Sequence, residues 1–275
     1  MRCRIVAIFL SLCGIAGEAE QSAIQSYEKS GDYAAAFELC MKTPDEAFSA
    51  YFIGDYLFHG RKGIVQNPIS GRKSYLKAIP GLTVLAKEGN ADAQYYLGRC
   101  YEYGKNDNIS AREWYIKAAD NGNSNAMVKA AMFIAKRRGG GKRNPQMVMT
   151  YIQKAIAAGN ADGKALLASY YLEGRKDIRK GIQLSKEASD AGSPLGQMLM
   201  GGIYMFGMGN IEKDELKAIE LFQSSSDQGN SLCLGMLFQL KKKQQVKRVQ
   251  INKSNLKQGV SLNNSESMEE QNCIK

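Results

Sequence analysis

The sequence is poor in the residues that metal sites, strands and membrane spans require. His59 is the only histidine in 275 residues, which excludes a histidine-rich metal site because such a site takes several imidazole ligands from the chain. There are only 5 prolines, and no run of alternating β-branched residues is bounded by turn residues, so we expect no sheet. After the N-terminus, no segment is apolar enough to span a bilayer. These absences leave a helical protein, with 44% apolar residues to form a substantial core.

The N-terminus carries the one long apolar run of the chain. Arg2 and Arg4 precede the apolar residues 5–12, and small residues follow. A basic start, a short apolar stretch and small residues before a cleavage point are typical of a secretory signal peptide. Because the apolar stretch is too short to cross a bilayer as a helix, we expect residues 1–19 to be removed.

The cleavage site and the compartment follow from the same segment. Small residues place the cut after Ala16 or after Ala19, and the sequence leaves both open. Cys13 suggests a lipoprotein box, but the bulky Leu12 stands where that box needs a small residue, so lipid attachment at Cys13 is not expected. We expect the mature protein in the periplasm or outside the cell.

Export changes the interpretation of the cysteines. Cys40, Cys100, Cys233 and Cys273 remain after cleavage. An oxidising compartment would allow two disulfides among them in any of three connectivities. The first three cysteines suit buried positions as single thiols equally well, so the sequence does not decide between the two hypotheses.

The formal net charge is +10 at pH 7. Such an excess steers acidic partners or anionic surfaces toward a protein. Nucleic acid would match the charge, but an exported protein rarely meets it. We therefore expect an acidic protein partner, with contact to an anionic envelope surface as a further option.

A Gly-Asn or Gly-Ser dipeptide returns at nearly constant spacing along the chain. The intervals between successive glycines are 33, 37, 33 and 37 residues. A period near 35 is typical of repeats in which one helix pair cannot bury its apolar face alone and stacks on its neighbours. The sequence therefore predicts an all-α fold, an α-solenoid winding into a right-handed superhelix. The dipeptides are Gly89-Asn90, Gly122-Asn123, Gly159-Asn160, Gly192-Ser193 and Gly229-Asn230.

Each glycine separates two amphipathic helices. Before it, bulky residues stand eight positions back and small residues four positions back, so that a neighbouring helix can approach their shared face. The glycine then supplies the left-handed conformation that ends the helix. After it, an apolar stripe carries a packing glycine, as in Ala93, Leu97, Gly98 and Tyr101. The bulky set is Trp114, Tyr151, Leu184 and Leu221, and the small set is Ala118, Ala155, Ala188 and Ser225.

The segments that flank the regular repeats depart from this repeat pattern. Residues 60–81 are expected to form an irregular connection, because Pro68 and Pro80 would break a continuous helix. Beyond about Asn252 the chain has too little apolar content to fold. The predicted organisation is a signal peptide (1–19), an N-terminal helical hairpin (20–44), a repeat solenoid (45–240), and a basic capping helix with a disordered polar tail (241–275).

Two stretches carry a pattern that identifies a family. They are Tyr204-x-x-Gly207-x-Gly209-x-x-x-x-Asp214-x-x-Lys217-Ala218 and Ala111-x-x-Trp114-Tyr115-x-Lys117-Ala118-Ala119-x-x-Gly122-Asn123. Over roughly residues 45–240 the chain resembles the Sel1-like repeat proteins, relatives of the tetratricopeptide repeat. The resemblance implies an α-solenoid that binds other proteins. For exported bacterial members it implies an envelope scaffold, a host-interaction factor or an immunity partner of a secreted toxin.

One branch of that family staples each helix pair with a disulfide. This chain lacks two cysteines per repeat, so the β-lactam binding proposed for that branch is not carried over.

The resemblance also places the concave face of the stack. In tetratricopeptide-like stacks this face is lined by the positions six and three before, and one and four after, the packing glycine. Tyr, Arg and Met at such positions are typical interface anchors, although Met198 and Met205 suit the core equally well. The predicted partner-binding residues are Tyr51, Asp55, Phe58, Tyr95, Arg99, Glu102, Ser169, Met198 and Met205.

Basic clusters at helix ends and loops form a second candidate surface. They suit either an acidic partner or an ordinary solvated rim. The predicted basic rim consists of Arg137, Arg138, Lys142, Arg143, Arg175 and Lys176.

No catalytic pattern stands out. His59 lies near a helix end, where an exposed imidazole satisfied by water or a carbonyl is expected. Ser26-x-x-Lys29 and Ser70-x-x-Lys73 match the acylation motif of penicillin-interacting enzymes, but the companion Ser-Asp-Asn and Lys-Thr-Gly elements are absent. We therefore predict a non-catalytic binding protein without cofactor or metal. Its most concrete role is a periplasmic partner or immunity-type inhibitor of a secreted effector, and the alternative is an envelope scaffold or a secreted host-interaction factor.

Overall fold

The computed structural model describes residues 21–142, 144–173 and 177–257. In this part of the chain the regular elements are helices, which confirms the predicted all-α solenoid. A first helical stretch covers residues 21–30. The helices that follow are α2 (Tyr33–Lys42), α3 (Ala47–His59), α4 (Pro68–Lys87), α5 (Ala91–Arg99), the π-helix η1 (Cys100–Lys105), α6 (Asn108–Asp120), α7 (Ser124–Ala135), α8 (Pro145–Ala157), α9 (Ala161–Leu172), α10 (Ile178–Asp190), α11 (Pro194–Phe206), α12 (Glu215–Asp227) and α13 (Ser231–Lys257).

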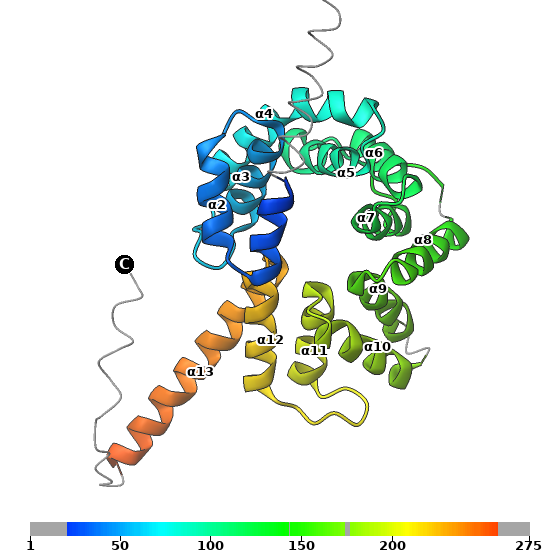
Figure 1. The fold of residues 1–275 in the computed structure, drawn as a ribbon. Helices are drawn as coiled ribbons and strands as arrows, with labels where there is room; N and C mark the ends of the chain where they lie inside the picture. The colour runs from blue at the N-terminus through cyan, green and yellow to red at the C-terminus, as the bar shows by residue number, and fades with distance from the viewer. Residues whose placement is uncertain (1–20, 143, 174–176, 258–275) are drawn as a thin grey trace, which may run out of the picture.

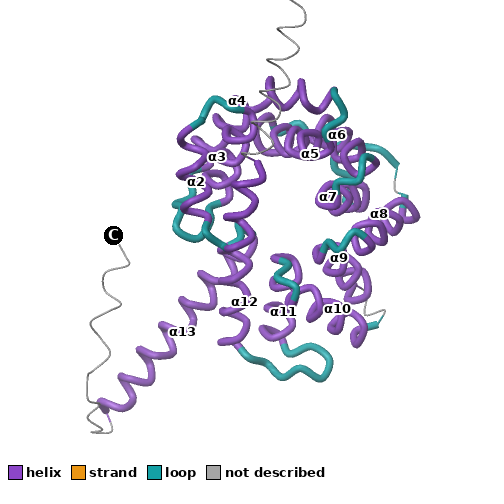
Figure 2. The backbone as a smooth tube through the Cα atoms, in the orientation of Figure 1, coloured by secondary structure: helices purple, strands orange, loops and turns teal. Residues whose placement is uncertain are grey.

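Successive helix pairs stack into a strongly curved solenoid (Figure 1). Helices α5, α7, α9 and α11 follow the inner side of the curve, and α6, α8 and α10 follow the outer side. Most connections are short, whereas a long loop joins α11 to α12 (Figure 2). The extra residues of this loop leave the stacking unchanged, because a surface loop absorbs an insertion at little entropic cost.

The Gly-Asn dipeptide ends one helix and begins the next. Gly122 has a φ of +94°, and an added Cβ would meet nothing within 4 Å, so glycine is needed for its left-handed backbone and not for space. The Asn123 N–H donates to the Ala118 carbonyl and closes α6. The Asn123 Oδ1 accepts from the Ala126 N–H at 2.7 Å and caps α7. Gly89-Asn90, Gly159-Asn160 and Gly192-Ser193 repeat this arrangement.

The capping side chains also link neighbouring repeats. Asn123 Nδ2 donates to Asp92 Oδ1 at 2.7 Å, and Asn160 Nδ2 donates to Asn125 Oδ1 at 2.8 Å. The Ser193 hydroxyl donates to the Asp162 carboxylate. Each bond joins the first turns of two successive inner helices, so the dipeptide fixes the spacing of the stack as well as the helix ends.

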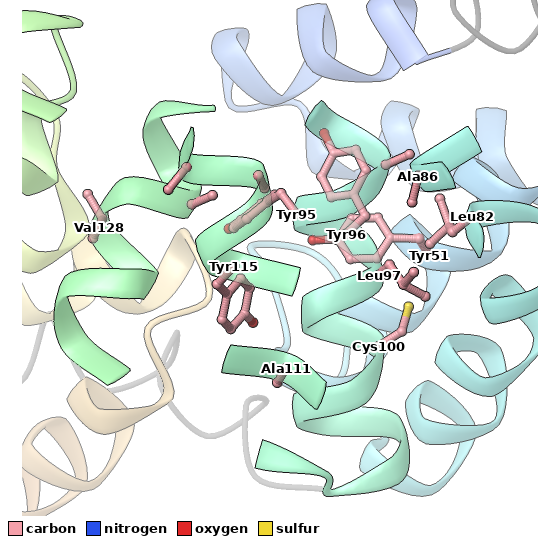
Figure 3. Packing of buried hydrophobic residues seen from close by; sticks show 14 of the residues in the cluster. Tyr51, Leu82, Ala86, Tyr95, Tyr96, Leu97, Cys100, Ala111, Tyr115 and Val128 are labelled. Carbon is pink, nitrogen blue, oxygen red and sulfur yellow. The ribbon is translucent and has the colours of Figure 1, made fainter. Parts of the chain in front are cut away.

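The packing glycines admit aromatic rings from the next helix. A Cβ on Gly98 would lie 2.8 Å from the Tyr115 ring, and one on Gly201 would lie 2.6 Å from the Phe222 ring. Both rings are fully buried, and each stands seven positions before a Gly-Asn glycine, one position beyond the bulky residue that the sequence pattern singled out. Figure 3 shows Tyr115 within the aromatic core formed around Tyr51, Tyr95 and Tyr96.

The prediction of an irregular connection over residues 60–81 is wrong in its second half. Helix α4 begins at Pro68 and continues through Pro80 to Lys87. Pro68 takes the first helical position, where a missing N–H costs nothing. Pro80 is exposed, and the burial of Tyr75, Ala78 and Leu82 on the opposite face holds the helix together across the lost hydrogen bond.

The stack curls until its two ends meet. The Lys62 N–H, after α3, donates to the Asp227 carbonyl at the end of α12 at 3.1 Å. Arg61 lies directly on Gly229, where an added Cβ would sit 1.4 Å from Nη1. Figure 1 shows the end of α12 close to α2 and α3. We call the contact of Arg61 and Lys62 with residues 227–229 the seam.

Helix α13 covers the last repeat. Cys233, Leu237 and Leu240 pack with Phe222, and Lys243 and Lys247 reach the Glu215 carboxylate at 2.7 and 3.5 Å. The helix extends to Lys257, beyond Asn252, where the sequence predicted a tail unable to fold.

The buried cysteines agree with one of the two sequence hypotheses. Cys40, Cys100 and Cys233 are all fully buried. The predicted signal peptide, Cys273 and the polar tail from 258 onward lie outside the described residues. Within the described part, no helix combines the length and the apolar character needed to cross a membrane.

Candidate partner-binding surfaces

The predicted concave residues separate into two hollows and a set of packed positions. Tyr51, Asp55, Tyr95 and Arg99 line a polar cavity at the seam, which we call the seam cavity. Ser169 and Met198 line an apolar groove between inner helices further along the chain, which we call the apolar groove. Phe58, Glu102 and Met205 line neither of these two hollows.

The seam cavity has a volume of about 440 Å³ and is built by both ends of the solenoid. Residues 21–30 contribute Gln25 and Glu28, α3 and α5 contribute the predicted residues, and Gln228 closes it from the last repeat. Aromatic rings form its walls, and the Tyr51 and Tyr96 rings stack at 4.2 Å between centroids.

A buried carboxylate organises the charges at this cavity. Asp55 is 3% exposed; Arg61 binds one carboxylate oxygen, and Arg99 reaches the other at 2.5 Å. The Tyr75 hydroxyl donates to Asp55 Oδ1 at 2.8 Å. Burial opposes ionisation of Asp55, but Arg99 and Arg61 outweigh it and hold its pKa below the ordinary value. The carboxylate is therefore ionised, and its ion pairs hold both guanidinium groups in position.

The prediction that His59 is exposed is wrong. The imidazole is 8% exposed, and its Nε2 lies 3.0 Å from Arg99 Nη2. Burial, with the nearby Arg99 and Arg61, lowers its pKa to about 3 despite the attraction of Asp55. A neutral imidazole can accept the Arg99 hydrogen bond through Nε2, so His59 helps to position Arg99.

Glu28 is a functional candidate that the sequence analysis missed. Burial is the main cause that raises its pKa to about 7, and Asp55 adds to this effect while Arg61, Tyr56 and Arg99 oppose it. Glu28 lies in the helical stretch 21–30, which precedes the first repeat and therefore shows no part of the repeat pattern. Arg61 was also missed, because it lies in the loop after α3, outside the helical positions that the repeat pattern describes.

Glu102 belongs to a second buried network. It is 4% exposed and accepts from the Tyr115 hydroxyl at 2.6 Å, from Lys129 at 3.2 Å and from Arg138 at 2.7 Å. Burial works against ionisation, but Lys129, Tyr115, Arg99 and Arg138 lower the Glu102 pKa to about 2. Glu102 thus joins η1 to the next repeat.

The apolar groove has a volume of about 520 Å³. Helices α7, α9 and α11 each contribute half-buried aliphatic side chains, such as Met132, Leu166 and Leu199, and α8 contributes Val148. Tyr170 and Leu232 border the groove and are 43% and 68% exposed. Lys136 and Glu173 are its charged residues. The groove is an open apolar surface of the kind that binds apolar protein segments.

The remaining predicted residues lie among packed side chains. Phe58 is half-buried against the rings of His59, Tyr75 and Tyr103, and Met205 packs on the core beneath α13.

The residues of the predicted basic rim also differ in their surroundings, since some are engaged and others are exposed. Arg138 is engaged with Glu102 and Asn108, whereas Arg137 and Lys142 are exposed after α7. Arg143, Arg175 and Lys176 lie outside the described residues.

The model of the Sel1 repeat family matches residues 47–79, 91–123, 161–193 and 194–230. The unmatched stretch between the second and third matches contains α7 and α8, which form a helix pair stacked like the others (Figure 1). A Sel1 repeat protein from Oxalobacter formigenes is 23% identical, covering 79% of this chain and 86% of that chain at a TM-score of 0.46. A protective antigen of uropathogenic Escherichia coli with an SLR fold is 20% identical, covering 80% of this chain and 48% of that chain at a TM-score of 0.41.

Proposed function

The chain belongs to the Sel1 repeat family, a protein–protein interaction fold, and on this premise we propose that it is a non-catalytic binding protein that holds an apolar segment of an acidic partner protein in the apolar groove. The observation that carries the proposal is the groove itself. Three successive inner helices leave aliphatic side chains half-buried around a hollow of about 520 Å³. Such surfaces are uncommon on a protein that binds nothing.

The charge around the groove favours an acidic partner. Lys136 borders the groove, and the exposed Arg137 and Lys142 follow directly in the loop after α7. With a formal net charge of +10 on the chain, these residues raise the rate of encounter with an acidic protein. The buried apolar area then provides the affinity.

The cellular setting of this proposal rests on the N-terminal segment. A signal peptide over residues 1–19 would deliver the protein to the periplasm or the exterior, where a secreted effector is the most concrete partner. A scaffold in the envelope would use the same groove with several partners. Fractionation of cells that express the full chain tests the compartment: recovery of the uncleaved chain in the cytoplasm would contradict it.

Binding is tested with one groove substitution and a matched control. Affinity capture from the native envelope identifies the partner, and calorimetry with that purified partner gives its dissociation constant. Met198→Glu places a charge in the groove and should weaken binding at least about tenfold. Met41→Glu changes the same residue type on α2, where Met41 is 52% exposed, and should leave the constant unchanged.

The outcomes separate the candidate roles. A nanomolar one-to-one complex favours an immunity-type partner, and several weaker partners favour a scaffold. If no protein is captured, or if Met198→Glu binds as well as the native chain, the proposal fails.

A further inference from the structure

The seam cavity has the size and the walls of a small-molecule site. Its volume of about 440 Å³ lies within the range of ligand pockets in proteins. Residues from the first helices, from α3 and α5 and from the last repeat surround it. Closure of the solenoid adds Gln228 to a lining that comes mainly from the first repeats. It is separate from the apolar groove and does not depend on the function proposed for that groove.

Two nearly buried guanidinium groups supply hydrogen-bond donors at this cavity. The side chains of Arg61 and Arg99 are 8% and 15% exposed. Asp55 accepts from some of the N–H donors of each guanidinium, yet a guanidinium carries more N–H donors than one carboxylate can accept. The buried Arg99 Nε has no hydrogen-bond partner among the described residues. Asn125 and Gln228 add amide groups to the lining.

The charges of the buried groups do not balance when Glu28 is protonated. Arg61 and Arg99 then carry two positive charges against the single negative charge of Asp55. Lys29, also in the lining, adds a third positive charge at the exposed edge. One further carboxylate would neutralise the buried set and accept from the donors that remain.

The aromatic walls indicate the rest of the ligand. The Tyr51 and Tyr96 rings stack, and the Tyr95 ring lies 5.4 Å from Tyr96 between centroids. Phe52 also lines the cavity, with its ring centroid 5.4 Å from that of Tyr96. Flat rings around a cavity of this size suit a planar apolar body. We propose that the seam cavity binds a small aromatic monocarboxylate, with its carboxylate at Arg61 and Arg99 and its ring against the tyrosine walls.

Glu28 makes this binding depend on pH. The groups that face it are Tyr33 on α2, Asp55 and Tyr56 on α3, Arg61, and Tyr96 and Arg99 on α5. Because burial raises the Glu28 pKa to about 7, the residue is mostly neutral at pH 6 and mostly ionised at pH 8. An ionised Glu28 competes with the ligand for the two arginines, so affinity should fall as the pH rises between these values.

The test uses sodium benzoate as the probe and the full mature chain. Ligand-observed NMR titration gives a dissociation constant at pH 6 and at pH 8, and the native protein should bind several-fold more tightly at pH 6. Glu28→Gln imitates the protonated side chain, so it should bind equally at the two pH values. Inorganic phosphate in place of benzoate should bind more weakly, because it has no planar body.

A second substitution tests the cavity without disturbing the buried ion pairs. Asn125→Asp keeps the Oδ1 acceptor that Asn160 uses but adds a negative charge to the lining, and benzoate affinity should fall at least about fivefold. Asn144→Asp is the matched control, since Asn144 only caps α8 and aspartate caps as well as asparagine. The proposal is overturned if benzoate does not bind, if Asn125→Asp binds it normally, or if Glu28→Gln keeps the pH dependence.

Discussion

At the scale of single residues, buried carboxylates hold the first repeats together. Asp55 and Glu102 are 3% and 4% exposed, and each has two or more cationic partners from other elements. A buried carboxylate with its partners intact contributes little net stability, but one that loses a partner is costly, because its charge stays desolvated. Both residues are among the predicted partner-binding positions, and in the structure both are engaged in buried ion pairs.

The substitution Lys129→Met should destabilise the protein by about 3 kcal/mol, because it removes one cation from the buried Glu102. Lys186→Met removes a lysine from an exposed pair with Asp190, in which the side chains are 67% and 64% exposed, and should cost less than about 0.5 kcal/mol. Urea denaturation followed by circular dichroism at pH 7 measures both values. Equal losses in the two variants would show that the Glu102 network is not energetically special.

At the scale of elements, the Gly-Asn dipeptide combines three tasks in two residues. The glycine ends the outer helix, and the asparagine caps the following inner helix. The amide of Asn123 then bonds to Asp92 in the preceding repeat. One short motif thus sets helix length, turn geometry and repeat spacing, which explains why its position along the chain varies so little.

Asn123→Ala should therefore cost more than the loss of a helix cap. The variant loses the cap on α7 and the 2.7 Å bond to Asp92, and we expect a loss of about 2 kcal/mol. Asn144→Ala removes only a cap, with the Met147 N–H at 3.0 Å from its Oδ1, and should cost about 1 kcal/mol. The difference between their free energies of unfolding isolates the link between repeats, and a zero difference would contradict the assigned role of the Asn123 amide.

The repeat pattern predicted the helices and most of their boundaries, because these depend on contacts within one helix pair or between adjacent pairs. Packing glycines such as Gly98 could be identified in this way. Pro80 misled the prediction, because the buried face of α4 outweighs its local effect. Tyr51, Asp55, Tyr95 and Arg99 were predicted among nine concave positions, because they share one register of the inner helices, and the structure brings these four to the seam cavity. Glu28 and Arg61 could not be found, because they belong to no repeat.

At the scale of the whole molecule, curvature brings residues together that no local pattern relates. Small rotations between successive repeats accumulate along a solenoid, and in this chain they bring Asp227 to Lys62 and Gly229 to Arg61. The seam that results is narrow, so the closed shape rests on few contacts. The seam also brings Gln228 into the lining of the seam cavity.

Gly229 offers a direct test of the closure. Its φ is +85°, and Gly192 has a φ of +80° with nothing within 4 Å of an added Cβ. Alanine at either position should cost about 1 kcal/mol from the left-handed backbone alone. Only Gly229→Ala also drives a methyl group into Arg61, whose guanidinium is held by Asp55 and cannot withdraw freely. This variant should open the seam and show a larger radius of gyration in small-angle X-ray scattering, whereas Gly192→Ala should match the native value. If Gly229→Ala scatters like the native protein, the contact of Arg61 with Gly229 is not what holds the two ends together in solution.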